Sequence, residues 1–215
     1  MMADTPGGDE VGGVVLCGGE SRRMGRPKAS LPFGDETMLD RVVGVVSAVV
    51  SPVIVVAGPK TQLPELRRRV AVVRDPVEGR GPLQGIAAGL TALRLDGLKA
   101  AFVTSCDIPL LSAAVVRVIV DSLGEADLSA VRIDGRWHPM AGVYRTALAE
   151  RAQERVDAGN LRVIDFLEVN GARETAEFAL RQTDPQLLSL MNVNTPEDYA
   201  RVLELAFPQS PPSDA

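Results

Sequence analysis

Histidine, cysteine and tryptophan are scarce in this 215-residue sequence, which contains one histidine, two cysteines and one tryptophan. A structural zinc site needs three or four well-spaced Cys or His ligands, and a disulfide framework needs several cysteine pairs. The composition therefore excludes both kinds of scaffold. It also disfavours catalysis by a cysteine–histidine pair, because His138 has only Cys17 and Cys106 as candidate partners.

The sequence also lacks an excess of positive charge and any long apolar run. Its formal net charge of −5 disfavours a broad surface for nucleic acid or anionic membranes. The longest apolar stretch, Val42–Val50, is too short to span a bilayer, and Met1–Glu10 has neither the basic nor the apolar region of a secretory signal. We therefore expect a cytoplasmic protein without nucleic-acid or membrane partners.

The length and the hydrophobic content of 46% are sufficient for one sizeable core. We predict a single domain over residues 11–206, since no linker divides the chain. Residues 1–10 and 208–215 are polar and contain Gly, Pro and Ser, so we predict that both are disordered tails.

Apolar β-branched runs alternate with longer segments of helical periodicity in the first half of the chain. The runs at 11–16, 53–57, 71–73 and 99–104 predict strands, and the segments at 39–50, 82–95 and 112–123 predict helices. Strands that are apolar on both faces are typical of parallel sheets covered on each side. The predicted fold is an α/β three-layer αβα sandwich with a mostly parallel central sheet.

The second half is less regular. Strands are predicted at 128–133 and 139–144 around an Asp-Gly turn, a helix at 146–158 and an edge strand at 173–178. The last helix has a clear start signal, because Thr195 can cap it, Pro196 suits its first turn and Asp198 stands at the acidic position of a capping box.

The segment Leu16–Lys28 follows the first predicted strand and combines glycines with basic residues. Its glycines allow close approach of a ligand to backbone N–H groups, and its four basic side chains suit a polyphosphate. The spacing matches neither a P-loop nor a dinucleotide fingerprint. A surface turn with solvated charges is the alternative. The residues concerned are Gly18, Gly19, Gly25, Arg22, Arg23, Arg26 and Lys28.

The pattern L-x-G-G-x-S-x-R-M-G-x-x-K over this segment resembles the signature of molybdenum cofactor guanylyltransferases. Residues 81–85, 106–109, 138–141 and 192–198 resemble later motifs of the same family, so the similarity covers about residues 11–206. The resemblance implies a Rossmann-like fold of the nucleotide-diphospho-sugar transferase type. It also implies transfer of GMP from GTP to the terminal phosphate of molybdenum-molybdopterin, with release of pyrophosphate.

Asp107 follows the apolar strand predicted at 99–104, and this places its carboxylate at the carboxyl edge of the sheet, where open α/β sheets bind ligands. Mg²⁺ prefers one or two carboxylates together with phosphate oxygens and water, so a single Asp beside a triphosphate is a sufficient anchor. We expect Asp107 to hold Mg²⁺. The alternative is a helix cap, because Pro109 and Ser112 follow closely.

The resemblance implies further site residues. Catalytic roles fall to Lys28, Arg23 and Asp107. Nucleotide contacts fall to Leu16, Cys17, Gly18, Gly19, Lys28, Asp75, Gly81, Gly85 and Asp107, and pterin contacts to Asn192 and Asn194. The implied substrates are GTP and molybdenum-molybdopterin, and cofactor-delivery proteins and acceptor molybdoenzymes are candidate partners.

Several of these residues have an ordinary structural explanation as well. Asp75 can form a turn before Pro76, Gly81 can mark a helix start, and the two asparagines can serve a turn and a cap. Trp137 could stack on a pterin, although a partly buried indole is the plainer interpretation. For His138 we expect a polar contact and not a general base.

The sequence departs from the family at three points. Cys17 stands where Ala is usual, Pro27 stands where Asp is frequent, and no Asn follows the strand at 53–57. The alternative functions are a related cytidylyltransferase or sugar-phosphate nucleotidyltransferase, or a nucleotide-binding regulatory module without turnover. Gly18-Gly19 favours guanine, and the presence of Lys28 and Asp107 argues against a regulatory module.

Overall fold

A seven-stranded sheet forms the centre of the computed structural model, which describes residues 10–18, 27–75, 77 and 79–208. The strand order is β5-β4-β1-β6-β8-β7-β9, and β8 runs antiparallel to both of its neighbours while the other pairings are parallel. The mostly parallel sheet is therefore confirmed. The strands are β1 (Val11–Cys17), β4 (Val53–Ala57), β5 (Ala71–Arg74), β6 (Ala100–Ser105), β7 (Leu128–Ile133), β8 (Arg136–Arg145) and β9 (Arg173–Thr175).

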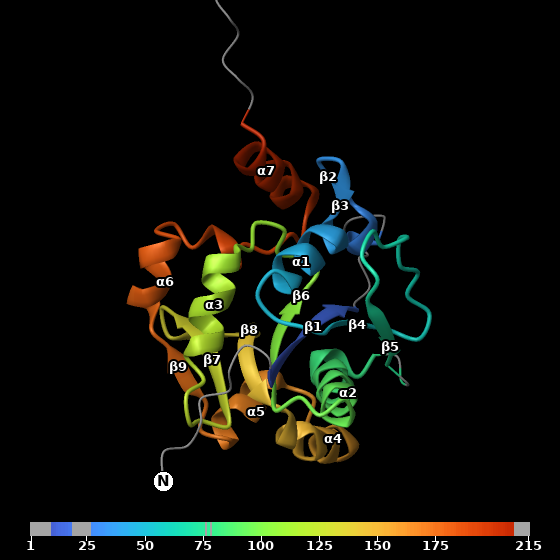
Figure 1. The fold of residues 1–215 in the computed structure, drawn as a ribbon, viewed down its shortest axis with the longest axis vertical. Helices are drawn as coiled ribbons and strands as arrows, with labels where there is room; N and C mark the ends of the chain where they lie inside the picture. The colour runs from blue at the N-terminus through green and yellow to red at the C-terminus, as the bar shows by residue number, and fades with distance from the viewer. Residues whose placement is uncertain (1–9, 19–26, 76, 78, 209–215) are drawn as a thin grey trace, which may run out of the picture.

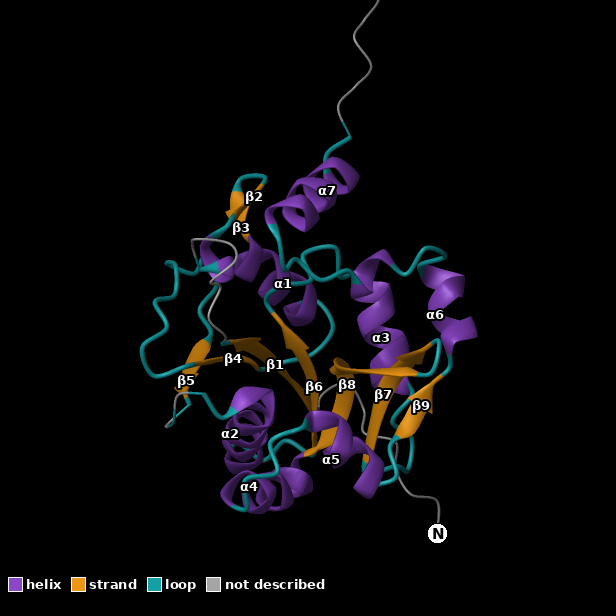
Figure 2. Ribbon diagram, turned by 180° about the vertical axis from the view of Figure 1, so that it is seen from behind, coloured by secondary structure: helices purple, strands orange, loops and turns teal. Residues whose placement is uncertain are grey.

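Helices cover both faces of this sheet (Figure 1), and the view from behind shows the same two layers (Figure 2). One layer contains α1 (Met38–Ser47), α3 (Ala113–Asp121) and α6 (Glu177–Thr183). The other contains α2 (Gly81–Leu95), α4 (Ala149–Asp157) and α5 (Val163–Val169). The three-layer αβα sandwich predicted from the sequence is confirmed.

The central strands are buried along their length because successive apolar side chains enter two different cores. Val15 and Phe102 pack toward α1 and α3, whereas Val14 and Val103 pack toward α2. Gly13 of β1 lets α1 approach closely, because a Cβ atom there would lie 2.6 Å from a methyl group of Val46. Burial on both faces explains the unbroken apolar runs of these strands.

The order of the strands creates a crevice between β1 and β6. The chain passes from β1 through α1 to β4 on one side of β1, and from β5 through α2 to β6 on the other side. Open α/β sheets bind ligands at such a reversal, outside the carboxyl ends of the strands. Gly18, which follows β1, and Asp107, which follows β6, both lie at this edge.

The second half differs from the prediction in several bounds. β8 begins at Arg136 instead of 139, a 3₁₀ turn at Thr146–Leu148 precedes α4, and the strand expected at 173–178 ends at Thr175 before α6 begins. β9 nevertheless lies at the sheet edge, as predicted. The sequence patterns did not predict α5 or α6, because helices of seven residues give a weak periodic signal.

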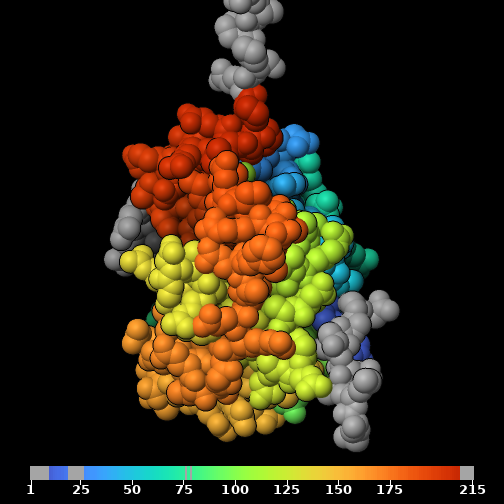
Figure 3. Space-filling model, turned by 90° about the vertical axis from the view of Figure 1, so that its left-hand side faces the viewer, coloured from blue at the N-terminus to red at the C-terminus, as the bar shows by residue number. Residues whose placement is uncertain are grey.

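The last helix, α7 (Pro196–Ala206), packs on the short hairpin of β2 (Pro32–Phe33) and β3 (Glu36–Thr37) in a third small core. Val202 of α7 is fully buried there against Phe33 and Met38. The C-terminal segments cover one side of the molecule from α7 down to α5 (Figure 3). Apart from residues 10 and 208, the two predicted tails lie outside the described residues. None of the described helices has the length and apolar character that crossing a membrane requires.

Candidate functional site

A cavity of about 920 Å³ opens at the carboxyl edge of the sheet. One half of its wall comes from β1, β4 and the start of α2, and the other half comes from β8 and the segment before α7. Asp107 lies between these halves, beside Ser105. The cavity therefore combines segments from β1 to the residues before α7, at the carboxyl edge where ligand binding is predicted.

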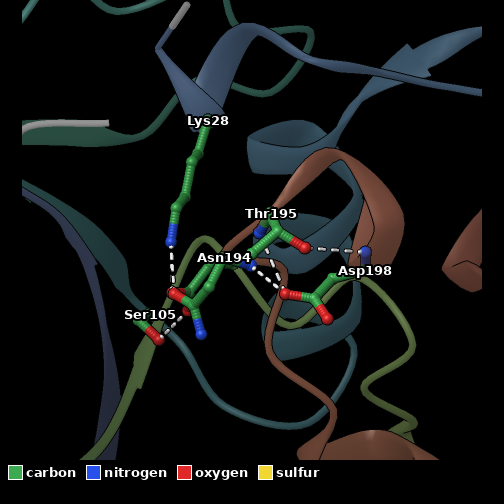
Figure 4. Close-up of polar contacts among 6 residues, drawn as sticks. Lys28, Ser105, Asn194, Thr195 and Asp198 are labelled. Atoms are coloured by element: carbon green, nitrogen blue, oxygen red, sulfur yellow. Dashed lines mark hydrogen bonds and ion pairs between the residues drawn. The ribbon is translucent and has the colours of Figure 1, made fainter. Parts of the chain in front are cut away.

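Lys28 lies at the centre of a contact between three distant segments. Its Nζ atom is 3.2 Å from Asp107 Oδ2 and 2.7 Å from Asn194 Oδ1, and Figure 4 shows the lysine reaching down toward Asn194. The side chains of Lys28 and Asp107 are only 19% and 21% exposed, so solvent screens this ion pair less than a surface pair. The lysine and aspartate predicted from the sequence thus lie at one site.

The carboxylate of Asp107 is fixed on both oxygens. Ser105 donates its hydroxyl to Oδ1 at 2.5 Å, while Oδ2 accepts from Lys28. The backbone N–H of Val193 donates to the Asp107 carbonyl at 2.8 Å, and this bond joins the segment before α7 to the end of β6. The alternative role of Asp107 as a helix cap is not what the structure shows, because the cap of α3 is Ser112.

Asn194 is held by the capping box of α7. The carboxylate of Asp198 accepts the backbone N–H groups of Asn194 and Thr195, each at 2.9 Å, and Thr195 accepts the N–H of Asp198 (Figure 4). These backbone hydrogen bonds, first that of Asn194, lower the pKa of the Asp198 carboxyl below its ordinary value of 3.8. The sequence predicted the cap but not that it orients a residue of the site.

The half of the cavity next to β1 and α2 is lined by predicted nucleotide-binding residues, among them Leu16, Gly18, Gly81 and Gly85. Gly85 is buried over Leu16, so that a Cβ atom would lie 3.1 Å from the leucine side chain. Gly81 has a φ of +69°, which favours glycine, and begins α2. A helix start leaves backbone N–H groups without helical partners, and such groups suit an anion.

Asp75 also lines this half, and its carboxylate accepts the N–H of Val77 at 3.0 Å. The turn role is therefore present, and a nucleotide contact remains a prediction. The nearby loop after β4 contributes Lys60 and Thr61 to the wall. Arg74 supports this loop by donating to the carbonyls of Gly58 and Thr61. Sequence reasoning missed this contribution, since no motif marked it.

Among the described residues, Lys28 and Cys17 are predicted site residues that do not line the cavity wall, and Lys28 instead contacts Asp107 and Asn194, which do line it. Gly19 and Arg23 lie outside the described residues. Cys17 is 2% exposed, and its thiol is directed into the core beside Cys106. The hydrogen bond with Cys106, together with burial, raises the pKa of the Cys17 thiol well above its ordinary value of 9.0. A contact of Cys17 with nucleotide could therefore involve only its backbone.

The other half of the wall comes from the start of β8. Arg136, Trp137, His138 and Met140 line it together with Asn192, and Asn194 lies where the halves meet. Sequence reasoning assigned no site role to Arg136 or Met140. Met140 lay in the strand predicted at 139–144, whereas Arg136 lay before that strand, so no sequence pattern marked Arg136. Burial lowers the pKa of His138 below its ordinary value of 6.5, so its imidazole is neutral at pH 7.

Asp107 is the carboxylate of this site that lies next to Lys28, and it suits a divalent cation. Within the described ranges, no group of three or more His, Cys, Asp and Glu side chains gathers in a way that could hold a metal ion. Mg²⁺ is commonly held by one or two carboxylates, with water and substrate phosphates completing its shell. One ordered carboxylate at the edge of an open cavity fits that requirement, and it does not fit a metal bound by protein ligands alone.

The strand order, the cavity at the switch point and the lysine–aspartate pair define an α/β protein of the nucleotide-binding class. The MobA-like NTP transferase domain matches residues 13–173, and the chain belongs to this family. A probable molybdenum cofactor guanylyltransferase of Mycobacterium avium is 38% identical over 200 residues, which cover 92% of this chain and 95% of that protein.

Two further similarities agree with this membership. A protein of the same description from Mycobacterium marinum is 40% identical over 191 residues, covering 87% of this chain and 90% of that one. The crystal structure of molybdopterin-guanine dinucleotide biosynthesis protein A from Archaeoglobus fulgidus superposes with a TM-score of 0.76 at 24% identity, covering 90% of this chain and 97% of that chain. The similarity to the Archaeoglobus fulgidus structure concerns the fold.

Proposed function

We propose that this chain is a molybdenum cofactor guanylyltransferase, which transfers GMP from GTP to the terminal phosphate of molybdenum-molybdopterin and releases pyrophosphate. The observation that carries the proposal is the convergence of Lys28, Asp107 and Asn194 beside one large cavity. The descriptions of the mycobacterial relatives support the choice of substrates.

The two halves of the cavity suit two substrates. The half next to β1, β4 and α2 has glycines and a helix start, which favour a nucleotide and its phosphates. The acceptor then occupies the half formed by β8 and the segment before α7. Asn192 and Asn194 border this second half, as expected for contacts with the pterin substrate.

The reaction needs no general base from the protein. The attacking oxygen belongs to a phosphate that is already ionised, so catalysis depends on in-line positioning and on neutralising the pyrophosphate leaving group. Lys28 provides the positive charge next to Asp107, and Arg23 would add a second charge from the preceding segment. A neutral His138 agrees with a mechanism in which no imidazole transfers a proton.

Mg²⁺ is the cofactor that we assign to this site, with Asp107 as its protein ligand. When bound, it would neutralise charge on the phosphate oxygens. Ser105 orients the carboxylate by its hydrogen bond to Oδ1, and Lys28 exchanges part of its contact with Oδ2 for contact with the phosphates. Both residues thus prepare a carboxylate of fixed direction before the substrates arrive.

The cytoplasm is the compartment that suits this reaction. Cys17 and Cys106 are adjacent in the core and remain free thiols, as is usual for proteins kept under reducing conditions. Proteins that deliver the molybdenum cofactor and molybdoenzymes that receive the product are the partners we expect. Contact with nucleic acid or membranes is not expected, because the net charge is −5.

Pyrophosphate release tests the proposal directly. The purified chain is incubated with GTP, Mg²⁺ and molybdenum-molybdopterin, and pyrophosphate and the dinucleotide product are measured. We expect product in equal amount to pyrophosphate, with CTP and ATP far less active and no release without the acceptor. Equal rates with GTP and CTP would contradict the guanylyl assignment, and absence of any product would contradict the transferase assignment.

A further inference from the structure

Trp137 is the single tryptophan of the chain, and the pairing of the strands places it at the same edge of the sheet as Asp107. Gly142 of β8 lies opposite Val103 of β6 and opposite Ala130 of β7. Trp137 pairs with Arg132, two residues beyond Ala130 and hence about 7 Å further toward the carboxyl edge. Ser105 is likewise two residues beyond Val103. Trp137 therefore lies level with Ser105, one strand away.

A bulge in β8 places the tryptophan at this level. Ala130 pairs with Gly142, whereas its neighbour Val131 pairs with His138, so residues 139–141 have no partner in β7. Pro139, Met140 and Ala141 line the cavity instead. Without the bulge, Trp137 would extend well past the sheet edge. Bulges commonly redirect side chains next to active sites, and this one brings an indole into the cavity wall.

Arg132 packs over the indole ring of Trp137. Its guanidinium carbon lies 5.1 Å from the centre of the Trp137 ring, and it is not one of the residues that line the cavity. Glu174 of β9 forms an ion pair with Arg132, and the carbonyl of Gly135 accepts from its Nε at 3.2 Å. The guanidinium that packs on the ring is thus itself anchored, and other parts of the ring line the cavity.

Arg136 adds positive charge to the same part of the wall. Its side chain is exposed and lines the cavity, and among the described residues it has no ion-pair partner. Phosphate esters and metal-bound oxygens are anionic, and a guanidinium without a protein partner suits them. A flat ring and a cation side by side match a ligand that combines a planar heterocycle with negative charge.

We propose that Trp137 is the stacking surface for the pterin ring of the acceptor, that Arg132 positions the indole, and that Arg136 binds the anionic part of the same molecule. This inference rests on the proposed function, because it assigns one substrate of that reaction to one half of the cavity. The guanine base belongs to the opposite half, next to β4 and α2, and does not contact Trp137.

Tryptophan fluorescence and calorimetry test the assignment with the full chain. The probe is 6-hydroxymethylpterin phosphate, a stable pterin with a phosphate ester, titrated with and without GTP and Mg²⁺. We expect Trp137→Ala to raise the dissociation constant of the probe by about tenfold, since stacking on an aromatic side chain contributes on that scale. Trp137→Phe should restore most of the affinity because it keeps a ring. GTP alone should leave the tryptophan emission unchanged.

The arginines give a second set of variants. Arg132→Gln should weaken probe binding while leaving GTP affinity unchanged. Arg136→Ala should also weaken probe binding and leave GTP affinity unchanged, and its probe affinity should depend less on salt concentration than that of the wild type. Arg201→Ala removes an exposed arginine from α7 outside the cavity and serves as the matched control. A purely structural role of Arg132 would lower thermal stability without separating the two affinities.

The outcomes separate this inference from the proposed function. Wild-type transfer of GMP by Trp137→Ala, with an unchanged KM for molybdenum-molybdopterin, would overturn the role of Trp137 and leave the proposed function standing. Quenching of Trp137 by GTP alone would also overturn it, since the ring would then belong to the nucleotide half. If the wild-type chain forms no dinucleotide product at all, the proposed function fails, and this inference fails with it.

Discussion

Lys28 Nζ lies 3.2 Å from Asp107 Oδ2 although 79 residues separate the two in the sequence. Lys28 lies at the end of the segment that follows β1, and Asp107 follows β6. Because β1 and β6 are neighbours in the sheet, both residues lie at the crevice between them. We infer that the pair belongs to a functional site and is not only a structural contact, because both side chains are partly accessible and Asp107 lines the cavity.

Replacement of Asp107 by Asn removes the charge and keeps the shape of the side chain. We expect kcat to fall by about 10² or more, as for the loss of one preorganised electrostatic contact. The melting temperature should change little, because Ser105 can still donate to the amide oxygen. Steady-state kinetics and calorimetry measure both. Asp157→Asn is the control, because it replaces an exposed carboxylate on α4. Turnover near the wild-type rate in Asp107→Asn would exclude Asp107 from catalysis.

Lys28→Ala should change the affinities for GTP and for a divalent cation in opposite directions. The lysine neutralises the carboxylate of Asp107, so its loss frees that carboxylate for Mn²⁺ in the absence of nucleotide. The same loss removes a positive charge from the triphosphate site and weakens GTP binding. Electron paramagnetic resonance of Mn²⁺ and calorimetric titration of GTP measure the two. Lys99→Ala, at the opposite edge of the sheet, is the control. A loss of affinity for both GTP and Mn²⁺ in Lys28→Ala would contradict the prediction that Lys28 and the cation compete for the carboxylate of Asp107.

The fold could be predicted from the sequence where one physical signal prevailed. The strands predicted at Val53–Ala57 and Leu128–Ile133 have the predicted bounds. The first is apolar at every position because a strand that is buried on both faces excludes polar side chains. The prediction of a strand over residues 173–178 was wrong in its second half. Glu177 and Phe178 belong instead to α6, whose seven residues are too few to show a helical period against their neighbours.

The site was predictable in its residues but not in its connections. Asp107, Asn194 and Asp198 were each singled out, yet no spacing in the sequence could show that Asp198 fixes the backbone that presents Asn194 to Lys28. Such contacts depend on how α7 packs over the β2–β3 hairpin, which is decided by tertiary burial of Val202. The bulge that brings Trp137 into the cavity wall was likewise invisible, because only the pairing partner reveals it.

Asp198→Ala should reduce stability and acceptor binding together. Loss of the capping box costs about 1 kcal/mol, which corresponds to a decrease in melting temperature of about 2–4 °C for a chain of this size. The KM for molybdenum-molybdopterin should rise because Asn194 loses its support, while GTP affinity changes less. Ser112→Ala removes the cap of α3 in the same way and is the control. If both variants changed KM equally, the effect of Asp198 would be general destabilisation.

The same carboxylate predicts a pH dependence. Backbone hydrogen bonds lower the pKa of Asp198 below 3.8 in the folded state, so its contribution to stability is complete above pH 3.8 and is lost as the pH falls through the lowered pKa. Urea unfolding at pH 6 and below pH 3.8 should therefore show a difference between wild type and Asp198→Asn that shrinks in acid. A constant difference would show that hydrogen-bond geometry, and not charge, supplies the stabilisation.

His138 should make the protein less stable as the pH falls below 6.5. Burial lowers its pKa in the folded state, whereas the unfolded chain takes up a proton at the ordinary value of 6.5. The unfolded state therefore binds more protons between the two pKa values, and the free energy of unfolding rises with pH across that window and is constant above it. His138→Gln removes the single imidazole of the chain and should abolish this part of the pH dependence. Urea unfolding of both proteins at pH 7.5 and 5.5 measures this difference in stability.

The same variant tests whether His138 takes part in catalysis. The kcat of His138→Gln at pH 7.5 should stay within a few-fold of the wild-type value, because His138 transfers no proton. A large loss of kcat with unchanged KM would instead give His138 a catalytic role and require a different account of how the acceptor phosphate is activated.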